Sequence, residues 1–181
     1  MGSSVLHGLI GRLNEALDSD PSAYLTIYKE GRIENITIEN ILKNDLAYAY
    51  ILTPSETEIT EASVPVAIAG VYGEIESKNF SIESNGKITY TGNFEKKFKV
   101  TVSLTIDPAS GSKKVCNTYI DKNGSVLGSS ASIASVDNSN PESIYCQAIV
   151  SLEKNDFIRV CIENTTDTVN LEVSKMTIII Q

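Results

Sequence analysis

Alternation of apolar and polar residues dominates the chain after residue 64. In residues 97–106, Phe98, Val100, Val102, Leu104 and Ile106 alternate with lysine, threonine and serine. Successive side chains of a strand point to opposite faces, so this pattern predicts a strand with one buried and one polar face. Residues 144–152 and 157–163 repeat it, with Ile144, Cys146, Ala148, Val150 and Leu152, and then Ile158, Val160 and Ile162, expected inward.

Turn residues separate these strands at fairly even intervals, which is typical of an all-β sandwich or barrel. Strands are expected over residues 66–75, 80–82, 86–91, 98–106, 114–121, 125–129, 144–152, 157–163 and 169–180. Asn123-Gly124 separates the fifth and sixth of these. Asn and Gly adopt positive φ at low cost, so the pair predicts a two-residue hairpin turn.

The last strand changes phase. Val169, Leu171 and Val173 share one phase, whereas Met176, Ile178 and Ile180 share the other, with Ile179 apolar between them. A strand changes phase either through a bulge or by being buried on both faces. Burial on both faces predicts an oligomer, with Met176, Ile178, Ile179 and Ile180 at the interface.

The region before residue 55 has a different pattern. Residues 5–17 have the apolar spacing of one helical stripe, formed by Leu6, Leu9, Ile10, Leu13 and Leu17. So short a helix needs a partner, either a surface on which it docks or copies of itself with which it bundles. We expect this stripe to attach the protein to a larger assembly.

Two further elements are expected before Pro54: a hairpin that turns across residues 29–32, and a second helix that begins at Thr37 and carries Ile38, Ile41, Leu42, Leu46 and Ala49. The sequence TPSETEITEASVP then has the composition of a linker. The predicted organisation is an attachment region over residues 1–55, a linker over residues 56–63 and a β domain over residues 64–181.

The net charge and the cysteine content of the chain indicate which partners it is unsuited to bind and in which compartment it is assembled. A formal charge of -8 and a pI near 4.7 argue against nucleic-acid binding, which needs clustered Lys and Arg. No apolar run reaches the roughly 20 residues of a membrane span. Cys116, Cys146 and Cys161 lie far apart, which favours buried, reduced thiols in a protein assembled in the cytoplasm.

The sequence contains no motif that predicts catalysis. His7 is the only histidine, and no cysteine lies near it in sequence to form a nucleophile and base pair. Glu74 and Glu76 share a strand face and could together bind a cation, but a solvated polar face explains them better. We therefore expect no enzyme activity, no cofactor and no metal. Asp137, Asn138 and Asn140, in the polar loop over residues 136–143, are candidates for binding a sugar or an ion.

The β domain also resembles a known family. The segments "SNGKITYTGNFEKKFKVTVSLTID", "YIDKNGSVLGSS" and "YCQAIVSLEKNDFIRVCIENTTDTVNLEVSKMTIII" are similar to the trimeric jelly roll of the tumour-necrosis-factor and complement-head type, as found in virion proteins of tailed bacteriophages. The resemblance covers residues 64–181. Asn155 stands where the family often has Gly, and Asn tolerates the left-handed conformation that the turn requires.

The resemblance implies a mainly β protein, a jelly-roll β-sandwich with a small N-terminal α+β attachment region. It further implies a non-enzymatic homotrimer that decorates a capsid or forms a head fibre, is assembled in the host cytoplasm and binds major capsid or tail proteins. The alternative is a tail-associated module that binds a receptor or host-surface glycan through Asp137, Asn138 and Asn140.

Overall fold

The computed structural model describes residues 24–29, 32–37, 45–107, 113–137 and 139–181, and the chain divides into two units, residues 1–44 and 45–181. In the first unit, β1 (Tyr24–Lys29) and β2 (Arg32–Thr37) form an antiparallel pair with Tyr24 opposite Thr37 and Lys29 opposite Arg32. This confirms the predicted hairpin strands. The predicted helical stripe Leu6, Leu9, Ile10, Leu13 and Leu17 lies outside the described residues.

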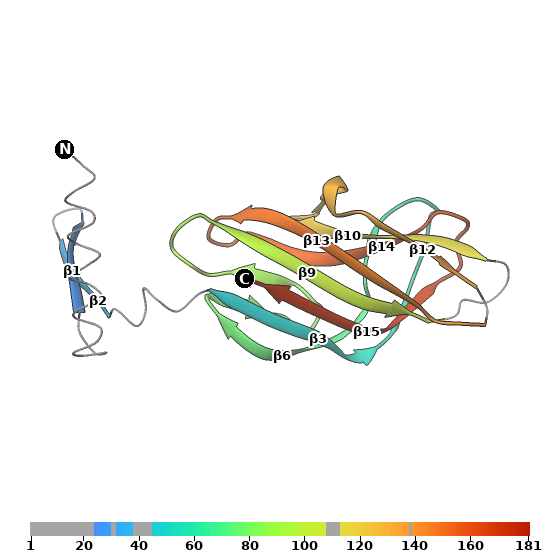
Figure 1. Cartoon of the computed structure of the whole chain (residues 1–181), viewed down its shortest axis with the longest axis horizontal. Coiled ribbons are helices and arrows are strands. Elements are labelled where there is room, and N and C mark those ends of the chain that lie inside the picture. Colours follow the sequence, from blue (N-terminus) through green and yellow to red (C-terminus); the bar gives the residue numbers. More distant parts are fainter. Residues whose placement is uncertain (1–23, 30–31, 38–44, 108–112, 138) are drawn as a thin grey trace. The chain divides into compact units, whose positions relative to one another are not determined.

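The second unit is a sandwich of two antiparallel sheets (Figure 1). The six-stranded sheet has the order β13 (Glu142–Leu152), β9 (Lys96–Ile106), β15 (Leu171–Ile180), β3 (Leu46–Pro54) and β6 (Gly70–Lys78), and β4 (Glu56–Thr57) also pairs with β15. The seven-stranded sheet has the order β11 (Ser125–Val126), β10 (Lys114–Lys122), β14 (Phe157–Asn164), β8 (Ile88–Tyr90) and β7 (Phe80–Ile82). In this sheet β12 (Ser132–Val136) pairs with β10, and β5 (Val66–Ala67) pairs with β14. The predicted jelly-roll β-sandwich is confirmed.

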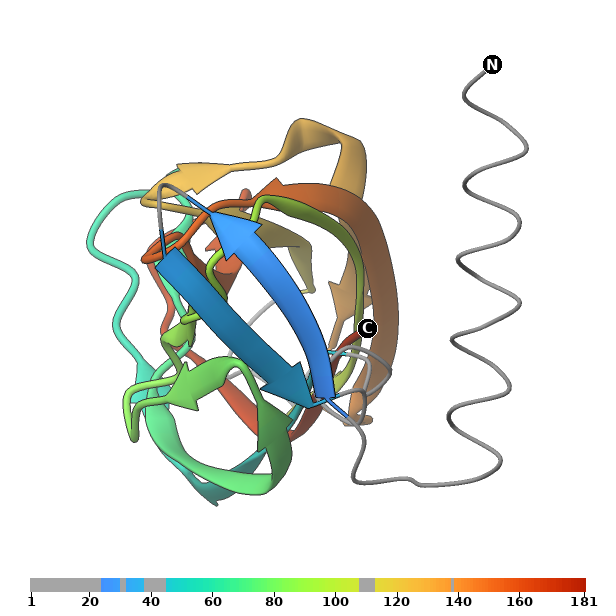
Figure 2. The same cartoon turned by 90° about the vertical axis from the view of Figure 1, so that its left-hand side faces the viewer.

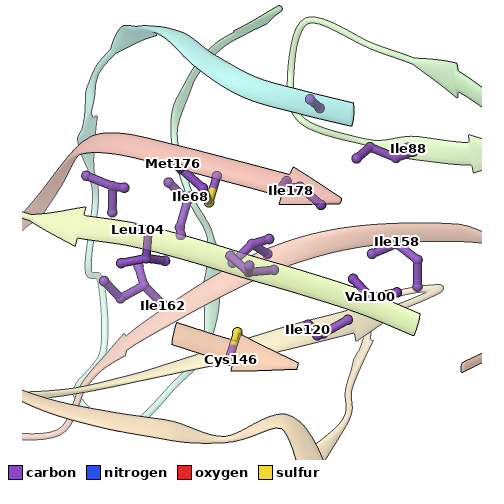
Figure 3. Close-up of a cluster of buried hydrophobic side chains, with 14 of the residues drawn as sticks. Ile68, Ile88, Val100, Leu104, Ile120, Cys146, Ile158, Ile162, Met176 and Ile178 are labelled. Atoms are coloured by element: carbon purple, nitrogen blue, oxygen red, sulfur yellow. The ribbon is translucent and has the colours of Figure 1, made fainter. Parts of the chain in front are cut away.

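The core lies between the two sheets, which enclose it when the sandwich is seen nearer to end-on (Figure 2). Val100 and Leu104 of β9 meet Ile120 of β10 and Ile158 and Ile162 of β14, as the close-up of the buried side chains shows (Figure 3). The inward phases predicted for β9, β13 and β14 are confirmed, except that Ala148 is only partly buried. Phe80, Tyr90 and Phe98 of the core pack together with ring centroids 5.0 to 5.2 Å apart; Phe98 meets the other two rings edge to face, and the Phe80 and Tyr90 rings are tilted by 49°.

The predicted second helix is wrong where the structure describes it, because residues 46–54 form strand β3. This strand pairs with β15 on one side and β6 on the other, so it belongs to the sandwich. Ala47, Ala49 and Ile51 point into the core, and Tyr48 and Tyr50 alternate with them. The unit boundary consequently lies between residues 44 and 45 and not near residue 55.

The predicted linker over residues 56–63 is also part of the sandwich. Glu56 and Thr57 pair with β15, and Ile59 is a core residue with 3% of its surface exposed. The Ile59 N–H donates a hydrogen bond to Asn170 Oδ1 at 2.9 Å. This acidic, threonine-rich segment is therefore an ordered part of the sandwich, in which the side chains of Thr57 and Ile59 are buried.

The two predicted asparagine turns are confirmed. Asn123 and Gly124 both have positive φ, 54° and 84°, as a type I′ hairpin requires, and Asn155 has φ 74°. Strand β11 ends at Val126, earlier than predicted, because a 3-10 turn, η1 (Gly128–Ser130), follows it.

Ion pairs with one buried member occur at several points of the sandwich. Asp45, at the start of the second unit, accepts hydrogen bonds from Lys96 Nζ at 2.5 Å, Asn79 Nδ2 at 2.6 Å and Tyr90 OH at 3.2 Å. Lys114, which is 2% exposed, pairs with Asp167. Each buried charge has a partner, which offsets its desolvation cost.

Candidate functional site

The outer face of the six-stranded sheet has an uncharged centre. Its cross-strand rows follow from the registers: Ile179 lies opposite Tyr48 and Thr101, and Thr177 lies opposite Tyr50 and Ser103. Gln147 of β13 continues the first row beyond Thr101. We call this surface the association face, and it consists of Tyr48, Tyr50, Thr101, Ser103, Gln147, Thr177 and Ile179. Figure 1 shows the strands that carry it side by side, in front of the seven-stranded sheet.

Every residue of the association face is at least partly exposed, because each alternates with a core residue of its strand. The face combines two aromatic rings and an isoleucine with small hydroxyl side chains. Charged residues lie at its border: Glu76 is opposite Tyr48, and Lys175 is opposite Thr105. In a single copy this face is in contact with water, and its small side chains allow another flat surface to pack closely against it.

Three strongly exposed apolar side chains lie on two edge strands, β13 and β12. Ile149 and Tyr145 of β13 are 77% and 53% exposed, and Ile133 of β12 is 72% exposed. We call these three residues the apolar edge. β13 is the last strand of the six-stranded sheet, and β12 pairs only with β10, so neither has a partner on its outer side. Unpaired apolar edges invite association.

An open depression of about 550 Å³ lies where the apolar edge meets the association face. Lys99, Ser129, Gln147, Ala148 and Ile149 line it. The lining contributes one cation and no carboxylate. The depression is therefore suited to receive an uncharged or negatively charged group, and its lining has no constellation for catalysis.

Of the four predicted interface residues, only Ile179 lies on a surface that a second copy can reach. Met176, Ile178 and Ile180 are 3%, 0% and 0% exposed and belong to the core of their own chain. Met176 and Ile178 lie among core side chains in Figure 3. Placing these three at an interface is thus corrected: the strand changes phase through a bulge between Val173 and Lys175, and not through burial on both faces.

The candidate ligand loop holds its own backbone together. Asp137 Oδ1 accepts hydrogen bonds from the N–H groups of Ser139 at 2.7 Å and Asn140 at 2.9 Å, which lower the pKa of the Asp137 carboxyl. Asn140 is exposed, and Asn138 lies outside the described residues. One of the two Asp137 carboxylate oxygens is thus used within the loop.

The residue types that could bind a metal ion or catalyse a reaction do not form such a site in the described part of the chain. Among the described residues, no group of three or more His, Cys, Asp and Glu could hold a metal ion, and His7 lies outside them. Glu74 and Glu76 are exposed on β6, and Glu74 accepts a hydrogen bond from Ser77 Oγ at 2.5 Å. The part of the chain that the structure describes has no helix long and apolar enough to cross a membrane.

The three cysteines are buried and unpaired with one another. Burial raises the pKa of Cys116 and of Cys146 to about 11, and burial together with the Asp121 charge raises that of Cys161 to about 12. The thiolate is the nucleophilic form, so these thiols are poor nucleophiles at neutral pH.

Two residues of the apolar edge can be recognised in the sequence itself. In residues 144–152, Tyr145 and Ile149 occupy the phase expected to face solvent, which otherwise contains polar residues. An apolar residue in the solvent phase of a strand is informative when several of them cluster. That β12, which carries Ile133, lies next to β13 depends on the fold, since β12 was not predicted as a strand.

Comparison with known proteins identifies no family. No protein-family model matches the sequence, and no curated protein matches it at a significant level. Among solved structures, murine APRIL at pH 5.0 aligns with a TM-score of 0.49 and 9% identity, over 75% of this chain and 98% of that one. Eiger TNF from S. frugiperda aligns with a TM-score of 0.47 and 10% identity, over 76% of this chain and 93% of that one. Likeness at this level concerns the fold alone.

Proposed function

We propose that the chain is a non-enzymatic structural protein that assembles into a homotrimer, with the apolar edge of each copy packed on the association face of the next. The observation that carries this is a set of strongly exposed apolar side chains on two edge strands: Tyr145 and Ile149 of β13, which flank Gln147 of the association face, and Ile133 of β12. Fully burying such a side chain contributes about 1.5 to 3 kcal/mol. Self-association removes all three from water.

The arrangement favours a closed ring. In the proposed packing the apolar edge of one copy meets the association face of the next, so the contact is heterologous, and a heterologous contact leaves both ends exposed unless the copies close around an axis. Lack of charge at the centre of the face avoids like-charge repulsion between copies of a protein with a formal charge of -8. The number three comes from the resemblance of residues 64–181 to trimeric jelly rolls.

We further propose a role as a capsid-decorating or head-fibre protein of a virion, attached through its N-terminal unit. Two observations support it: the resemblance of the β domain to bacteriophage virion proteins, and the division of the chain at residue 44, which gives the sandwich a separate N-terminal unit. Major capsid or tail proteins are the expected partners, and assembly is expected in the host cytoplasm.

The alternative, a tail-associated module that binds a host glycan, has less support. Its candidate loop uses Asp137 Oδ1 to hold the backbone N–H groups of Ser139 and Asn140. A glycan array probed with the purified protein distinguishes the two: saturable binding that Asp137→Ala removes would favour the alternative.

Two measurements test the main proposal. Sedimentation of the full chain should give three times the mass of one copy, and a monomer at micromolar concentration would refute the assembly. Removing residues 1–44, which leaves β3 intact, should keep the trimer and abolish its binding to particles. If the truncated trimer binds particles as well as the full chain does, attachment through the N-terminal unit is wrong.

A further inference from the structure

Two turns of the sandwich are fastened to each other by one asparagine side chain. Asn123, in the turn between β10 and β11, donates a hydrogen bond from Nδ2 to Asp156 Oδ1 at 2.7 Å. Asn123 Oδ1 in turn accepts one from the Phe157 N–H at 2.9 Å. Asp156 and Phe157 follow the turn between β13 and β14. We call Asn123, Asp156 and Phe157 the clasp.

Asn-Gly is also the pair in which an asparagine most easily loses its side-chain amide. The backbone nitrogen of the glycine attacks Cγ of the asparagine, the N–Cγ bond forms, and the Cγ–Nδ2 bond breaks. Ammonia leaves with the proton of that nitrogen, and water then opens the cyclic imide to aspartate or isoaspartate. Gly124 is exposed, and a Cβ placed on it would have no atom within 4 Å, so no other part of the chain crowds this glycine on its side-chain side.

We infer that Asn123 is a latent deamidation site that the clasp holds in an unreactive position. Both polar atoms of its amide are hydrogen-bonded to the neighbouring turn, so both bonds must break before Cγ can turn toward the Gly124 nitrogen. One of these bonds is to a carboxylate, and such charge-assisted bonds are the stronger kind. When the clasp is lost, Cγ of Asn123 is free to approach the backbone nitrogen of Gly124.

Deamidation would in turn open the clasp. The product carries a carboxylate where Nδ2 donated, and it would face the carboxylate of Asp156. Asp156 is held in place by Lys122 Nζ at 2.8 Å and by the Glu153 N–H at 2.9 Å, so it cannot easily withdraw. Repulsion between the two carboxylates would separate the two turns irreversibly.

The chain contains a second Asn-Gly pair that serves as an internal reference. Asn85 is exposed; its Nδ2 donates a long hydrogen bond to Glu83 at 3.4 Å, and its Oδ1 accepts one from the Lys87 N–H at 3.0 Å. Its neighbour Gly86 is different from Gly124: it is buried against the Tyr72 ring, and its N–H donates to the Glu83 carbonyl oxygen at 3.0 Å. Asn85 is thus restrained both at its side-chain amide and at the glycine nitrogen that would attack it, whereas Asn123 is restrained at its side-chain amide. Removing Asp156 should affect Asn123 alone.

The test uses the full chain incubated in mildly alkaline buffer, with peptide mass spectrometry and isoaspartate detection to follow each asparagine. In Asp156→Ala, Asn123 should deamidate about tenfold faster than in the unmodified chain, as expected from the loss of a charge-assisted hydrogen bond. Asn85 should keep its rate. Lys122→Gln is the matched control, since it removes the ion pair to Asp156 but leaves the clasp, and its Asn123 rate should stay unchanged.

Three results would overturn the inference: an equal Asn123 rate in Asp156→Ala and the unmodified chain, acceleration of both asparagines together, or acceleration by Lys122→Gln alone. Asp156→Asn is a second variant of nearly the same shape, and faster deamidation of Asn123 is expected there too. If neither variant folds, the inference can be tested on the unmodified chain. Its Asn123 should deamidate more slowly in the folded protein than in denaturant. Equal rates would show that the fold does not protect Asn123.

Discussion

Ile178 and Ile179 are adjacent in β15 but lie on opposite faces of the six-stranded sheet. Ile178 is fully buried in the core of its own chain, whereas Ile179 is half-buried on the association face between Tyr48 and Thr101. Because of this alternation, Ile178 contributes to folding, whereas the neighbouring Ile179 is available for assembly.

The first prediction uses this pair. Ile178→Ala should lower the free energy of unfolding by about 2 to 5 kcal/mol, because it removes a buried side chain and leaves a cavity. Ile179→Arg should keep the fold and shift the protein toward monomer, because it places a charge on the association face. Urea denaturation and sedimentation of both variants measure the two effects. Equal loss of assembly in both, with equal stability, would contradict this division.

The second prediction concerns the apolar edge. Ile149→Arg should dissociate the assembly at micromolar concentration, because Ile149 is 77% exposed in one copy and gains a charge that the interface cannot solvate. The melting temperature of the dissociated chain should change little. Val126→Arg, at a 39% exposed position on the seven-stranded sheet, is the matched control and should leave the mass unchanged. Dissociation by both variants would show that the effect is not specific to the edge.

The third prediction is an acid-sensitive bond at Asp45. Burial by itself raises the pKa of this carboxyl, but hydrogen bonds from Lys96, Asn79 and Tyr90 outweigh it, so the folded pKa lies below the ordinary 3.8. A lowered folded pKa gives stability that is present above the unfolded value and is lost as the pH falls through the folded value. Asp45→Asn should therefore destabilise the chain at neutral pH by about 1 to 3 kcal/mol.

That difference between the unmodified chain and Asp45→Asn should shrink as the pH falls below 3.8, where the carboxyl of the unfolded chain becomes neutral. Thermal melts of both proteins over a series of pH values give the comparison. A difference that stays constant down to the lowest pH at which both fold would rule out the ion pair as its cause.

The fourth prediction concerns thiol reactivity. Cys116, Cys146 and Cys161 are buried with raised pKa values, so a small thiol reagent at neutral pH should label none of the three in the folded chain and all three in denaturant. Mass spectrometry counts the labels. Rapid labelling of one cysteine in the folded chain would show that its surroundings open easily or that its thiol is activated.

Local patterns were sufficient where one face of a strand is buried and the other is polar. The alternation in β9, β13 and β14 gave the correct inward residues, because burial of one face imposes a period of two on the sequence. The conformations of Asn123 and Asn155 were also predictable, since few residues adopt positive φ.

Local patterns were misleading where the neighbours decide the structure. Residues 46–54 contain Leu46 and Ala49 at helical spacing from earlier apolar residues, yet pairing with β15 and β6 makes them a strand. Ile59 is one apolar residue in an acidic stretch, and only its contact with the assembled core shows that it is an anchor.

The sequence by itself determined a mainly β sandwich with an N-terminal hairpin, because alternation and turn chemistry are local properties of the chain. Tertiary structure alone decided which face of β15 is free and which residues form the apolar edge. A bulge between Val173 and Lys175 and the pairing of distant strands set these, and both depend on contacts between residues far apart in sequence.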